Sequence, residues 1–236
     1  MELIAHRGGR GFGVDNTLEA MEAAERAGVR YIETDLRWTA DNKLIVCHDT
    51  TVFNHIISHT TYSELKNHAP ERPLLEDVLE SLAGWVRFDL EVKQAPPWAV
   101  REALYEYRIE LDTLITSFDI DFLGDFKKRC PEVRTGLLFR SPFSFHKKCL
   151  AATACGAEVL LPYFHDVKPE FLKDAHRSGL EVYAWTVNEI PDLERLIGWG
   201  IDGIVTDRYL QFRNHLNEMG HNRSDGSSAS ARRYRR

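Results

Sequence analysis

The chain has 236 residues, of which 43% are hydrophobic and 28% charged, and its formal net charge at pH 7 is −6. This length fits one large α/β domain or two small ones, with ample apolar content for a core. The negative charge, and the lack of a basic stripe in the body of the chain, argue against a nucleic-acid partner.

The chain also lacks the usual signs of a membrane or secreted protein. No apolar run approaches the ~18 residues of a membrane span, and the N-terminal MELIAHRGG has no signal-peptide pattern. The cysteines have no CxxC spacing, so free thiols in a reducing cytosol are the simplest interpretation. We therefore expect a cytoplasmic protein with no membrane span.

The first predicted strand, 2–6, ends at His6 and leads into the glycine-rich segment 7–13. Four glycines in this segment indicate either an anion-binding loop, with free N–H groups and basic residues, or a flexible turn. Residues 15–17 supply candidate caps for a helix over 18–28.

The second predicted strand, 29–36, places Glu33 and Asp35 two residues apart, so both carboxylates leave the same face. Such a pair is costly unless a cation meets it. A further apolar segment, 43–47, leads to His48. We interpret this segment as an irregular extension on the second βα loop and not as a strand of the main sheet.

Residues 49–72 show no clean period and contain three histidines, which indicates a lid or an excursion. A helix begins at 73–79, and the strand 86–92 follows. In that strand Asp89 and Glu91 are in phase, and Lys93 lies just beyond it.

From this point helices and strands alternate regularly. The predicted helices are 97–107, 120–129, 145–155, 169–178, 190–198 and 208–219. The predicted strands between them are 111–116, 134–138, 158–161, 180–185 and 201–205.

This alternation predicts right-handed βαβ units around a parallel sheet. At this length a single-domain (β/α)8 TIM barrel is favoured over a doubly wound sheet, because no GxGxxG turn follows the first strand. We place the barrel domain at 1–219. The Ser-, Gly- and Arg-rich segment 220–236 is interpreted as a disordered basic tail.

The conspicuous polar residues and one aromatic all fall at or near predicted strand ends, where the active sites of such barrels lie. They are His6, Arg7, Glu33, Asp35, His48, Glu91, Lys93, Ser117 and Trp185. Taken singly, either histidine is more often structural, and Glu33 with Asp35 fits an ion-paired strand end equally well. Their shared placement is harder to attribute to chance.

Together these residues predict a metal and phosphate site. Three converging carboxylates need a cation, and oxygen ligands favour Mg²⁺, Ca²⁺ or Mn²⁺ over zinc. Arg7 and Lys93 beside them suit a phosphate. Two histidines supply an acid and a base for P–O cleavage, whereas Ser117 is interpreted as structural.

Eight stretches of the chain resemble the glycerophosphodiester phosphodiesterase family, in the family's order. They are IAHRGG at 4–9, DNTLEAM at 15–21, GVRYIETDLRWTADNKLIVCHD at 28–49, PLLEDVL at 73–79, LEVK at 90–93, ITSFD at 115–119, GLEVYAWTVNE at 179–189 and GIDGIVTDR at 200–208.

The resemblance implies a barrel of the phosphatidylinositol-phospholipase-like type that converts a glycerophosphodiester to glycerol 3-phosphate and an alcohol. A divalent metal would be held by Glu33, Asp35 and Glu91. His6 and His48 would form the acid/base pair, with Arg7 and Lys93 on the phosphate. One family route uses the substrate's neighbouring hydroxyl as nucleophile and passes through a cyclic phosphate.

The resemblance also suggests that Trp185 forms a pocket wall beside the glycerol, although plain barrel filling explains it as well. Phe118 and Tyr163 are weaker candidates for this wall. The chain departs from the family's pattern at Asp15, where the family has Glu, at Asn42, where it has Gly, and in the shorter segment 50–72. A shorter cover indicates a more open pocket and leaves the alcohol unspecified.

Two other functions stay open at this point. One is phospholipase D-like action on lysophospholipids, as in the related sphingomyelinase D barrels, and the other is a non-catalytic phosphate-binding barrel. The expected partner is a small phosphodiester. The preferred metal and the oligomeric state, a homo-oligomer included, are not determined by the sequence.

Overall fold

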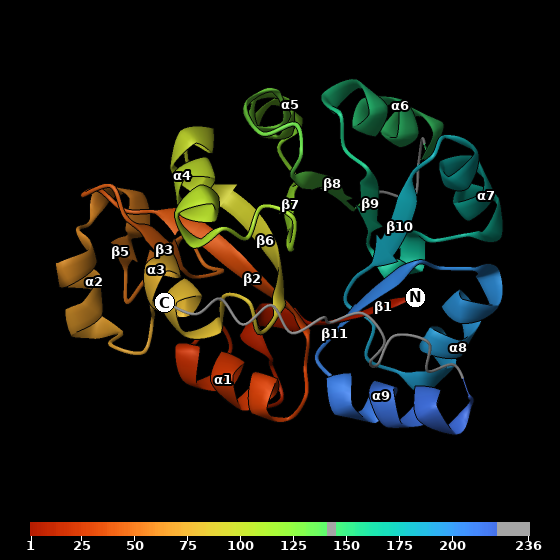
Figure 1. Cartoon of the computed structure of the whole chain (residues 1–236), viewed down its shortest axis with the longest axis horizontal. Coiled ribbons are helices and arrows are strands. Elements are labelled where there is room, and N and C mark those ends of the chain that lie inside the picture. The colour runs from red at the N-terminus through yellow and green to blue at the C-terminus, as the bar shows by residue number, and fades with distance from the viewer. Residues whose placement is uncertain (141–144, 221–236) are drawn as a thin grey trace.

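The computed structural model describes residues 1–140 and 145–220. In this part of the chain eight parallel strands close into a barrel, in the order β1, β11, β10, β9, β8, β7, β6, β2 (Figure 1). A pairing of Ala5 with Ile32 joins β1 to β2 and completes the ring. The predicted TIM barrel is therefore confirmed.

The barrel strands lie close to their predicted positions. They are β1 Glu2–Ala5, β2 Tyr31–Trp38, β6 Arg87–Gln94, β7 Thr113–Ser117, β8 Arg134–Phe139, β9 Val159–Pro162, β10 Glu181–Ala184 and β11 Gly203–Thr206.

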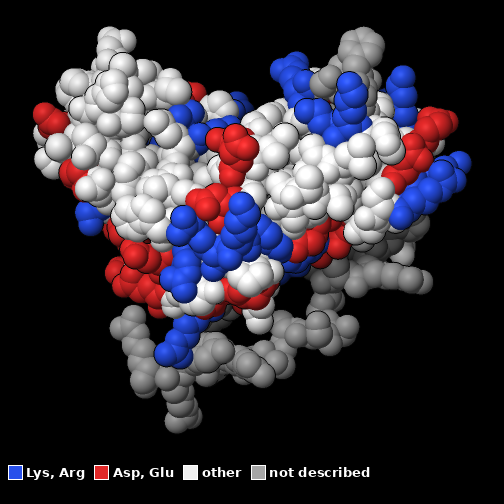
Figure 2. Space-filling model, turned by 90° about the horizontal axis from the view of Figure 1, so that it is seen from above, with Lys and Arg blue, Asp and Glu red and all other residues white. Residues whose placement is uncertain are grey.

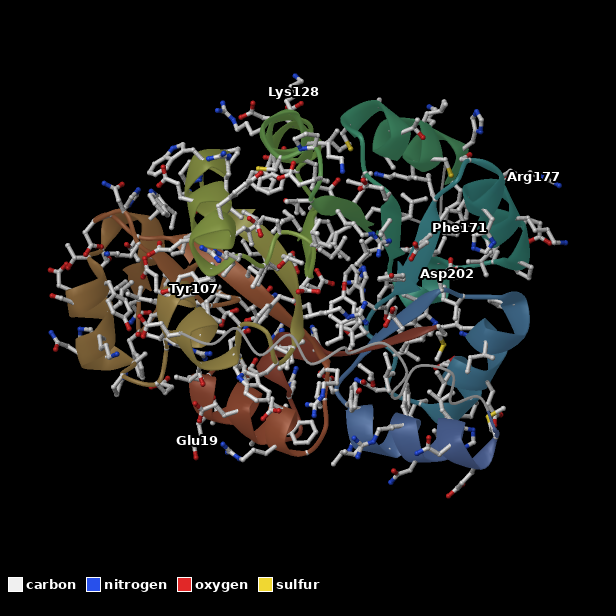
Figure 3. The ribbon with its side chains drawn as sticks, in the orientation of Figure 1. Glu19, Tyr107, Lys128, Phe171, Arg177 and Asp202 are labelled. Atoms are coloured by element: carbon white, nitrogen blue, oxygen red, sulfur yellow. The ribbon has the colours of Figure 1, made fainter. Side chains whose placement is uncertain are left out.

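Helices surround this barrel on the outside (Figure 1). They are α1 Leu18–Arg26, α3 Leu75–Leu82, α4 Pro97–Tyr107, α5 Ile120–Arg129, α6 Phe145–Cys155, α7 Pro169–Arg177, α8 Ile190–Trp199 and α9 Tyr209–Glu218. Figure 3 shows the amphipathic pattern on α7, where Phe171 points toward the barrel and Arg177 points away from it. Each helix thus buries an apolar stripe against the strands.

Two layers of apolar side chains stabilise the barrel. One layer lies between the strands and the helices and includes Phe88, Phe126 and Phe171. A smaller cluster, which includes Ile4 and Tyr183, packs across the strands themselves. The mouth of the barrel at the C-terminal strand ends is left for polar side chains, as this fold requires.

The segment 43–47 was expected to stand outside the barrel, and it does. β3, Leu44–Val46, pairs antiparallel with Leu36–Trp38 at the end of β2. This pairing extends β2 beyond its predicted end, so the interpretation of Glu33 and Asp35 as strand-end residues is wrong. They lie within the strand because β3 supplies hydrogen-bond partners for the residues that follow them.

The excursion 49–72 contains more regular structure than its pattern indicates. A hairpin of β4, Thr51–Val52, and β5, His55–Ile56, is followed by the 3₁₀ turn η2, Ile57–His59, and by α2, Tyr62–His68. A capping box between Thr61 and Glu64 begins α2. Elements this short contain too few residues to show a period.

Four remaining expectations concern membrane spans, surface charge, the chain end and the cysteines. In the part of the chain that the structure describes, no helix has both the length and the apolar character to cross a membrane. Figure 2 shows acidic and basic side chains side by side on the face seen from above. The predicted tail 220–236 lies outside the described residues apart from Gly220. All four cysteines are buried and unpaired.

Candidate active site

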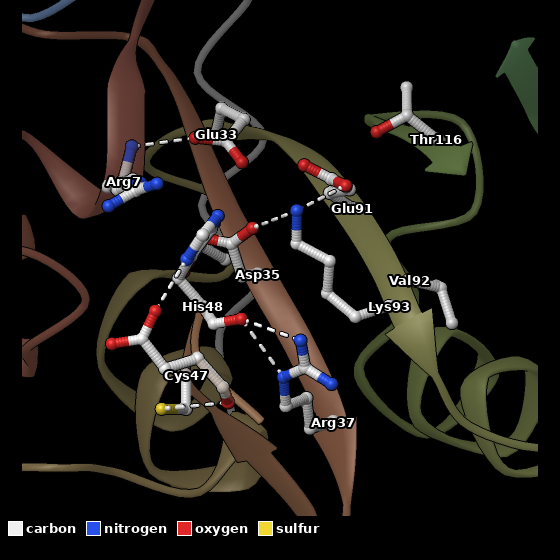
Figure 4. A network of polar contacts seen from close by, with 12 residues as sticks. Arg7, Glu33, Asp35, Arg37, Cys47, His48, Glu91, Val92, Lys93 and Thr116 are labelled. Carbon is white, nitrogen blue, oxygen red and sulfur yellow. Dashed lines mark hydrogen bonds and ion pairs between the residues drawn. The ribbon is translucent and has the colours of Figure 1, made fainter. Parts of the chain in front are cut away.

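Three carboxylates meet in the mouth of the barrel. Glu33 and Asp35 project from β2, and Glu91 projects from the neighbouring β6, where it lies directly opposite Asp35. One oxygen of each can be chosen so that all three lie within 4.8 Å of one another. Figure 4 shows the group between the two parallel strands. The sequence pattern of two in-phase acids and a later third therefore describes one cluster.

The electrostatics of this cluster are unbalanced without a cation. Burial and then the neighbouring carboxylates of Asp35, Asp89 and Glu91 raise the pKa of Glu33 well above its ordinary value. Burial and then Asp35 raise the pKa of Glu91 to about 7. Burial opposes ionisation of Asp35 too, but Lys93 and the Asn16 amide outweigh it and lower the pKa of that carboxyl. The nearby basic groups therefore do not supply enough positive charge to stabilise all three carboxyl groups in their ionised form.

Two basic residues lie at the edges of the cluster. Lys93 Nζ lies 2.5 Å from Glu91 Oε1 and 3.2 Å from Asp35 Oδ1. Arg7 adopts a left-handed backbone, with φ of 48°, and its N–H donates to Glu33 Oε2 at 2.6 Å. The buried Arg7 Nε has no partner among the described residues. Such a strained residue with an unused donor is typical of a ligand site.

His6 lies in the short turn η1, His6–Gly8, directly after β1. Its Nδ1 lies 2.7 Å from Asp207 Oδ1, and its Nε2 lies 4.0 Å from Glu33 Oε2. Asn188 fixes this carboxylate in turn, since its Nδ2 donates to Asp207 Oδ2 at 2.7 Å and its Oδ1 accepts from the Asp207 N–H at 2.9 Å. The arrangement turns Nε2 of His6 toward the acids.

His48 follows β3 and approaches the acids from the other direction. Its Nδ1 lies 2.9 Å from Asp49 Oδ1, and the His48 and Asp49 side chains are 38% and 77% exposed. Figure 4 shows its ring beside Asp35. The His48 carbonyl accepts hydrogen bonds from Arg37 Nε at 3.0 Å and Nη2 at 2.8 Å. Both histidines thus engage a carboxylate through Nδ1, and Nε2 of each ring is not part of these contacts.

An aromatic wall continues from the basic edge of the cluster. Lys93 Nζ lies 5.8 Å from the centre of the Phe118 ring, which meets Trp185 edge to face at 5.8 Å. Tyr163 lies 5.7 Å from Trp185 on its other side. The indole N–H of Trp185 donates to the Leu161 carbonyl at 2.7 Å, which fixes the ring. The three aromatic residues singled out in the sequence are therefore neighbours.

Ser117, a further strand-end residue, has a different position. Its buried hydroxyl donates to the Val92 carbonyl at 2.8 Å and accepts from the Asp119 N–H at 3.1 Å. These bonds join β7 to β6 and shape the start of α5. They agree with the interpretation of Ser117 as structural.

Four residues that contact the site were not assigned to it from the sequence: Asn16, Arg37, Asn188 and Asp207. Asn16 was considered only as a helix cap, yet its amide donates to Asp35 Oδ2 at 2.8 Å and accepts from Thr34 at 2.7 Å. Arg37 has the same strand phase as Glu33 and Asp35, and Asp207 directly follows the last strand. These two features could be seen in the sequence, but neither of them shows which residue Arg37 or Asp207 would contact.

A barrel with an acidic, cation-flanked mouth and two carboxylate-paired histidines fits the class of phosphoric diester hydrolases. The model of the glycerophosphoryl diester phosphodiesterase family matches residues 6–211. The chain belongs to this family, and the prediction of a phosphoric diester hydrolase is confirmed.

Relatives and solved structures agree with this assignment. A glycerophosphodiester phosphodiesterase of Caldanaerobacter subterraneus is 31% identical over 87% of this chain and 93% of its own length. The structure of a glycerophosphodiester phosphodiesterase from Parabacteroides distasonis is 26% identical, with a TM-score of 0.81 over 93% of this chain and 98% of that one. A phosphodiesterase from Oleispira antarctica, solved with its product sn-glycerol-3-phosphate, shares the fold at 20% identity, with a TM-score of 0.81 over 92% and 97% of the two chains.

Proposed function

We propose that this chain hydrolyses glycerophosphodiesters to glycerol 3-phosphate and an alcohol, with a divalent metal ion and with His6 and His48 as the acid/base pair. The observation that carries this proposal is the convergence of three carboxylates, two cations and two carboxylate-paired histidines on one barrel mouth. Family membership and the product bound by the Oleispira protein support the choice of substrate.

The residues present fit a hard divalent cation. Glu33, Asp35 and Glu91 offer only oxygen atoms as ligands. The raised pKa values of Glu33 and Glu91 indicate that a positive charge between these carboxylates would stabilise their ionised form. These three side chains would hold Mg²⁺, Ca²⁺ or Mn²⁺. When bound, such an ion would stabilise the negative charge on a phosphoryl oxygen of the substrate.

Arg7 and Lys93 would hold the phosphate from the side of the acids. The guanidinium of Arg7 presents a fork of donors, including its unpartnered Nε, which suits the oxygens of a phosphoryl group. Lys93 acts as a point charge between Asp35 and Glu91, and its ammonium is within reach of an oxygen held there.

The histidines would move the protons. One Nε2 takes the proton of the attacking hydroxyl, which is either water or the neighbouring hydroxyl of the substrate. As the P–O bond to the alcohol breaks, the leaving oxygen takes a proton from Nε2 of the other histidine. In the route through a cyclic phosphate, water then opens the ring and the two histidines exchange roles. Asp207 and Asp49 keep each Nδ1 engaged throughout.

The wall of Phe118, Tyr163 and Trp185 would contact the organic part of the substrate. Phe118 is 47% exposed although it touches Trp185, so its ring offers apolar surface at the mouth. This surface favours one alternative, phospholipase D-like action on lysophospholipids, whose acyl chain would need such a contact. The cytoplasmic location stays a prediction.

The test compares several substrates and substitutions of the proposed metal ligands. Metal-supplied protein should release glycerol 3-phosphate from at least one of glycerophospho-choline, -ethanolamine, -glycerol and -inositol. Glu33→Gln and Glu91→Gln should abolish this turnover while the circular dichroism spectrum stays native. Activity that persists in EDTA would contradict the metal role. Release of choline from lysophosphatidylcholine alone would favour the alternative.

A further inference from the structure

His48 needs a support that its own carboxylate partner does not provide. The side chain of Asp49 is 77% exposed, so the hydrogen bond between Asp49 and the imidazole competes with water. His48 also lies in a link of four residues, Cys47–Thr50, between two very short strands. A loop of this kind does not hold a side chain to the tolerance that proton transfer requires.

The ends of this link are fixed by backbone hydrogen bonds. The N–H of Cys47 donates to the Asp35 carbonyl at 2.9 Å, and the Thr50 carbonyl accepts from the Ile57 N–H at 3.0 Å. Within the link the Cys47 thiol, a weak donor, contacts the Asp49 carbonyl at 3.7 Å, and neither this contact nor the two anchors engages the carbonyl of His48 itself. The position of its ring beside Asp35 therefore depends on what holds that carbonyl (Figure 4).

Arg37 holds that carbonyl. It lies on β2 in phase with Glu33 and Asp35, and it pairs with Gln94 of β6 just beyond the point where β6 has one extra residue, Lys93, between the partners of Leu36 and Arg37. The side chain is buried, with the whole residue 9% exposed. Both Nε and Nη2 donate to the single carbonyl oxygen of His48, at 3.0 and 2.8 Å.

This geometry restrains the carbonyl strongly. Two donors of a rigid, planar fork converge on one acceptor, so they fix its position in two directions, and each bond is strengthened by the positive charge. A buried guanidinium in turn requires an acceptor. The same β2 strand thus presents the metal-site acids and, two residues further, the side chain that holds His48 beside them (Figure 4).

We propose that Arg37 is a positioning residue, which sets the place of His48 by holding its backbone carbonyl. The proposal rests on the proposed function of His48 as one of the acid/base pair. It assigns Arg37 no contact with the substrate. Lysine cannot replace it, because a single ammonium does not reproduce the planar fork.

The test uses Arg37→Met, Arg37→Lys and Arg37→Ala in the full chain, with glycerophosphodiester turnover as the readout. We expect kcat to fall by about 10- to 100-fold in all three, because displacement of a proton-transfer group by ~1 Å has an effect of this size. KM should change less than about twofold, since the phosphate contacts remain. Guanidinium ion at millimolar concentration should partly restore kcat of Arg37→Ala and should not affect Arg37→Met.

Arg213→Met is the matched control. Arg213 also donates to a backbone carbonyl, that of Ala27 at 2.8 Å, and its guanidinium lies over the Tyr209 ring, away from the barrel mouth. This variant should lose thermal stability and keep kcat. If Arg37 acted only through stability, its variants would resemble Arg213→Met and would show no rescue by guanidinium, which would overturn the proposal.

A second measurement is independent of turnover. The imidazole carbon–proton NMR signals of His48, assigned with His48→Gln, should shift and broaden in Arg37→Met, while those of His6 stay in place. Unchanged His48 signals would refute the positioning role even in a protein without activity. The outcome for the proposed function is separate. If the wild type hydrolysed no glycerophosphodiester but the His48 signals still shifted in Arg37→Met, the proposed function would be contradicted and the positioning role of Arg37 would stand.

Discussion

The two histidines of the mouth are supported in different ways. His6 contacts Asp207, and that carboxylate is fixed in turn by Asn188 through two hydrogen bonds. His48 contacts an exposed neighbour in sequence, Asp49, and is held through its backbone by Arg37. The His6 side relies on hydrogen-bonded side chains from strands that are distant in sequence but adjacent in the barrel. The His48 side relies on one arginine that binds a short loop. The difference means that substitutions of the supporting residues on the two sides should not have equal effects.

Removing either ring should have the largest effect, and here the two sides should agree. His6→Gln and His48→Gln each delete one proton-transfer group, so we expect kcat to fall by about 100- to 10,000-fold. Steady-state kinetics on an accepted glycerophosphodiester measures this. Retention of more than about a tenth of the activity by either variant would remove that histidine from the acid/base pair.

The two carboxylate partners should separate the sides. Asp207→Asn keeps the shape but favours the wrong imidazole tautomer, and its site is half-buried, so kcat should fall by about 100-fold. Asp49→Asn should lower kcat by less than about tenfold, because the exposed Asp49 is not the main support of His48. The measurement is kcat of Asp207→Asn and of Asp49→Asn under the same conditions. Equal losses would show that the exposed pair of His48 and Asp49 contributes as much to kcat as the half-buried pair of His6 and Asp207.

Asn188 tests the outer layer on the His6 side. Asn188→Leu removes the donor to Asp207 Oδ2 and the acceptor for the Asp207 N–H. These two groups are half-buried, so leaving them unsatisfied should cost about 1 kcal/mol, the low end of the range for buried groups, and urea unfolding should show a loss of that size. A loss of kcat at unchanged KM should accompany it. Thr17→Ala, which deletes the helix cap of α1 outside the site, is a control that should lower stability alone.

The last prediction concerns the buried Asp89, which neither histidine contacts, and the pH dependence of stability instead of kcat. Burial and then Glu91 and Asp35 raise the pKa of Asp89 to about 7, against the pull of a Thr116 hydrogen bond. Because the folded pKa exceeds the unfolded one, Asp89 destabilises the fold increasingly as pH rises from about 4 to about 7, by up to about 4 kcal/mol. Metal-free protein should therefore have a higher Tm at about pH 5 than at about pH 8.

Asp89→Asn isolates this contribution. Asparagine still accepts the Thr116 hydroxyl, whose distance to Asp89 Oδ1 is 2.7 Å, but it carries no charge. The variant should raise Tm at alkaline pH and flatten its pH dependence in EDTA, as measured by differential scanning fluorimetry. A variant that is less stable than the wild type at every pH would show that the ionised carboxylate is favourable after all.

The fold was largely predictable because each barrel unit repeats a local pattern. Helices such as 97–107 and 120–129 have the predicted bounds, since their capping and apolar stripes are encoded within the segment. The end of β2 was not predictable in this way. It depends on pairing with β3, and a single strand pattern does not reveal which partner continues beside it.

The site was predictable in part for a related reason. Glu33 and Asp35 share a strand phase, and the barrel places Glu91 on the neighbouring strand, so residue types and topology together predicted the convergence of the three acids. The metal and the phosphate at this cluster remain our proposal. The residues that hold the two histidines in place could not be predicted in this way. Asp207 and His6 lie 201 positions apart and meet only because the last barrel strand closes on the first. Arg37 acts through a backbone carbonyl, and backbone acceptors leave no trace in the residue types of a sequence.

The most direct test of this account is phosphorus NMR of a glycerophosphodiester incubated with the metal-supplied protein. We expect the signal of glycerol 3-phosphate to replace the diester signal in the wild type, and we expect no such replacement in EDTA or in His6→Gln. No conversion of any glycerophosphodiester, together with saturable binding, would contradict it and would indicate a phosphate-binding barrel.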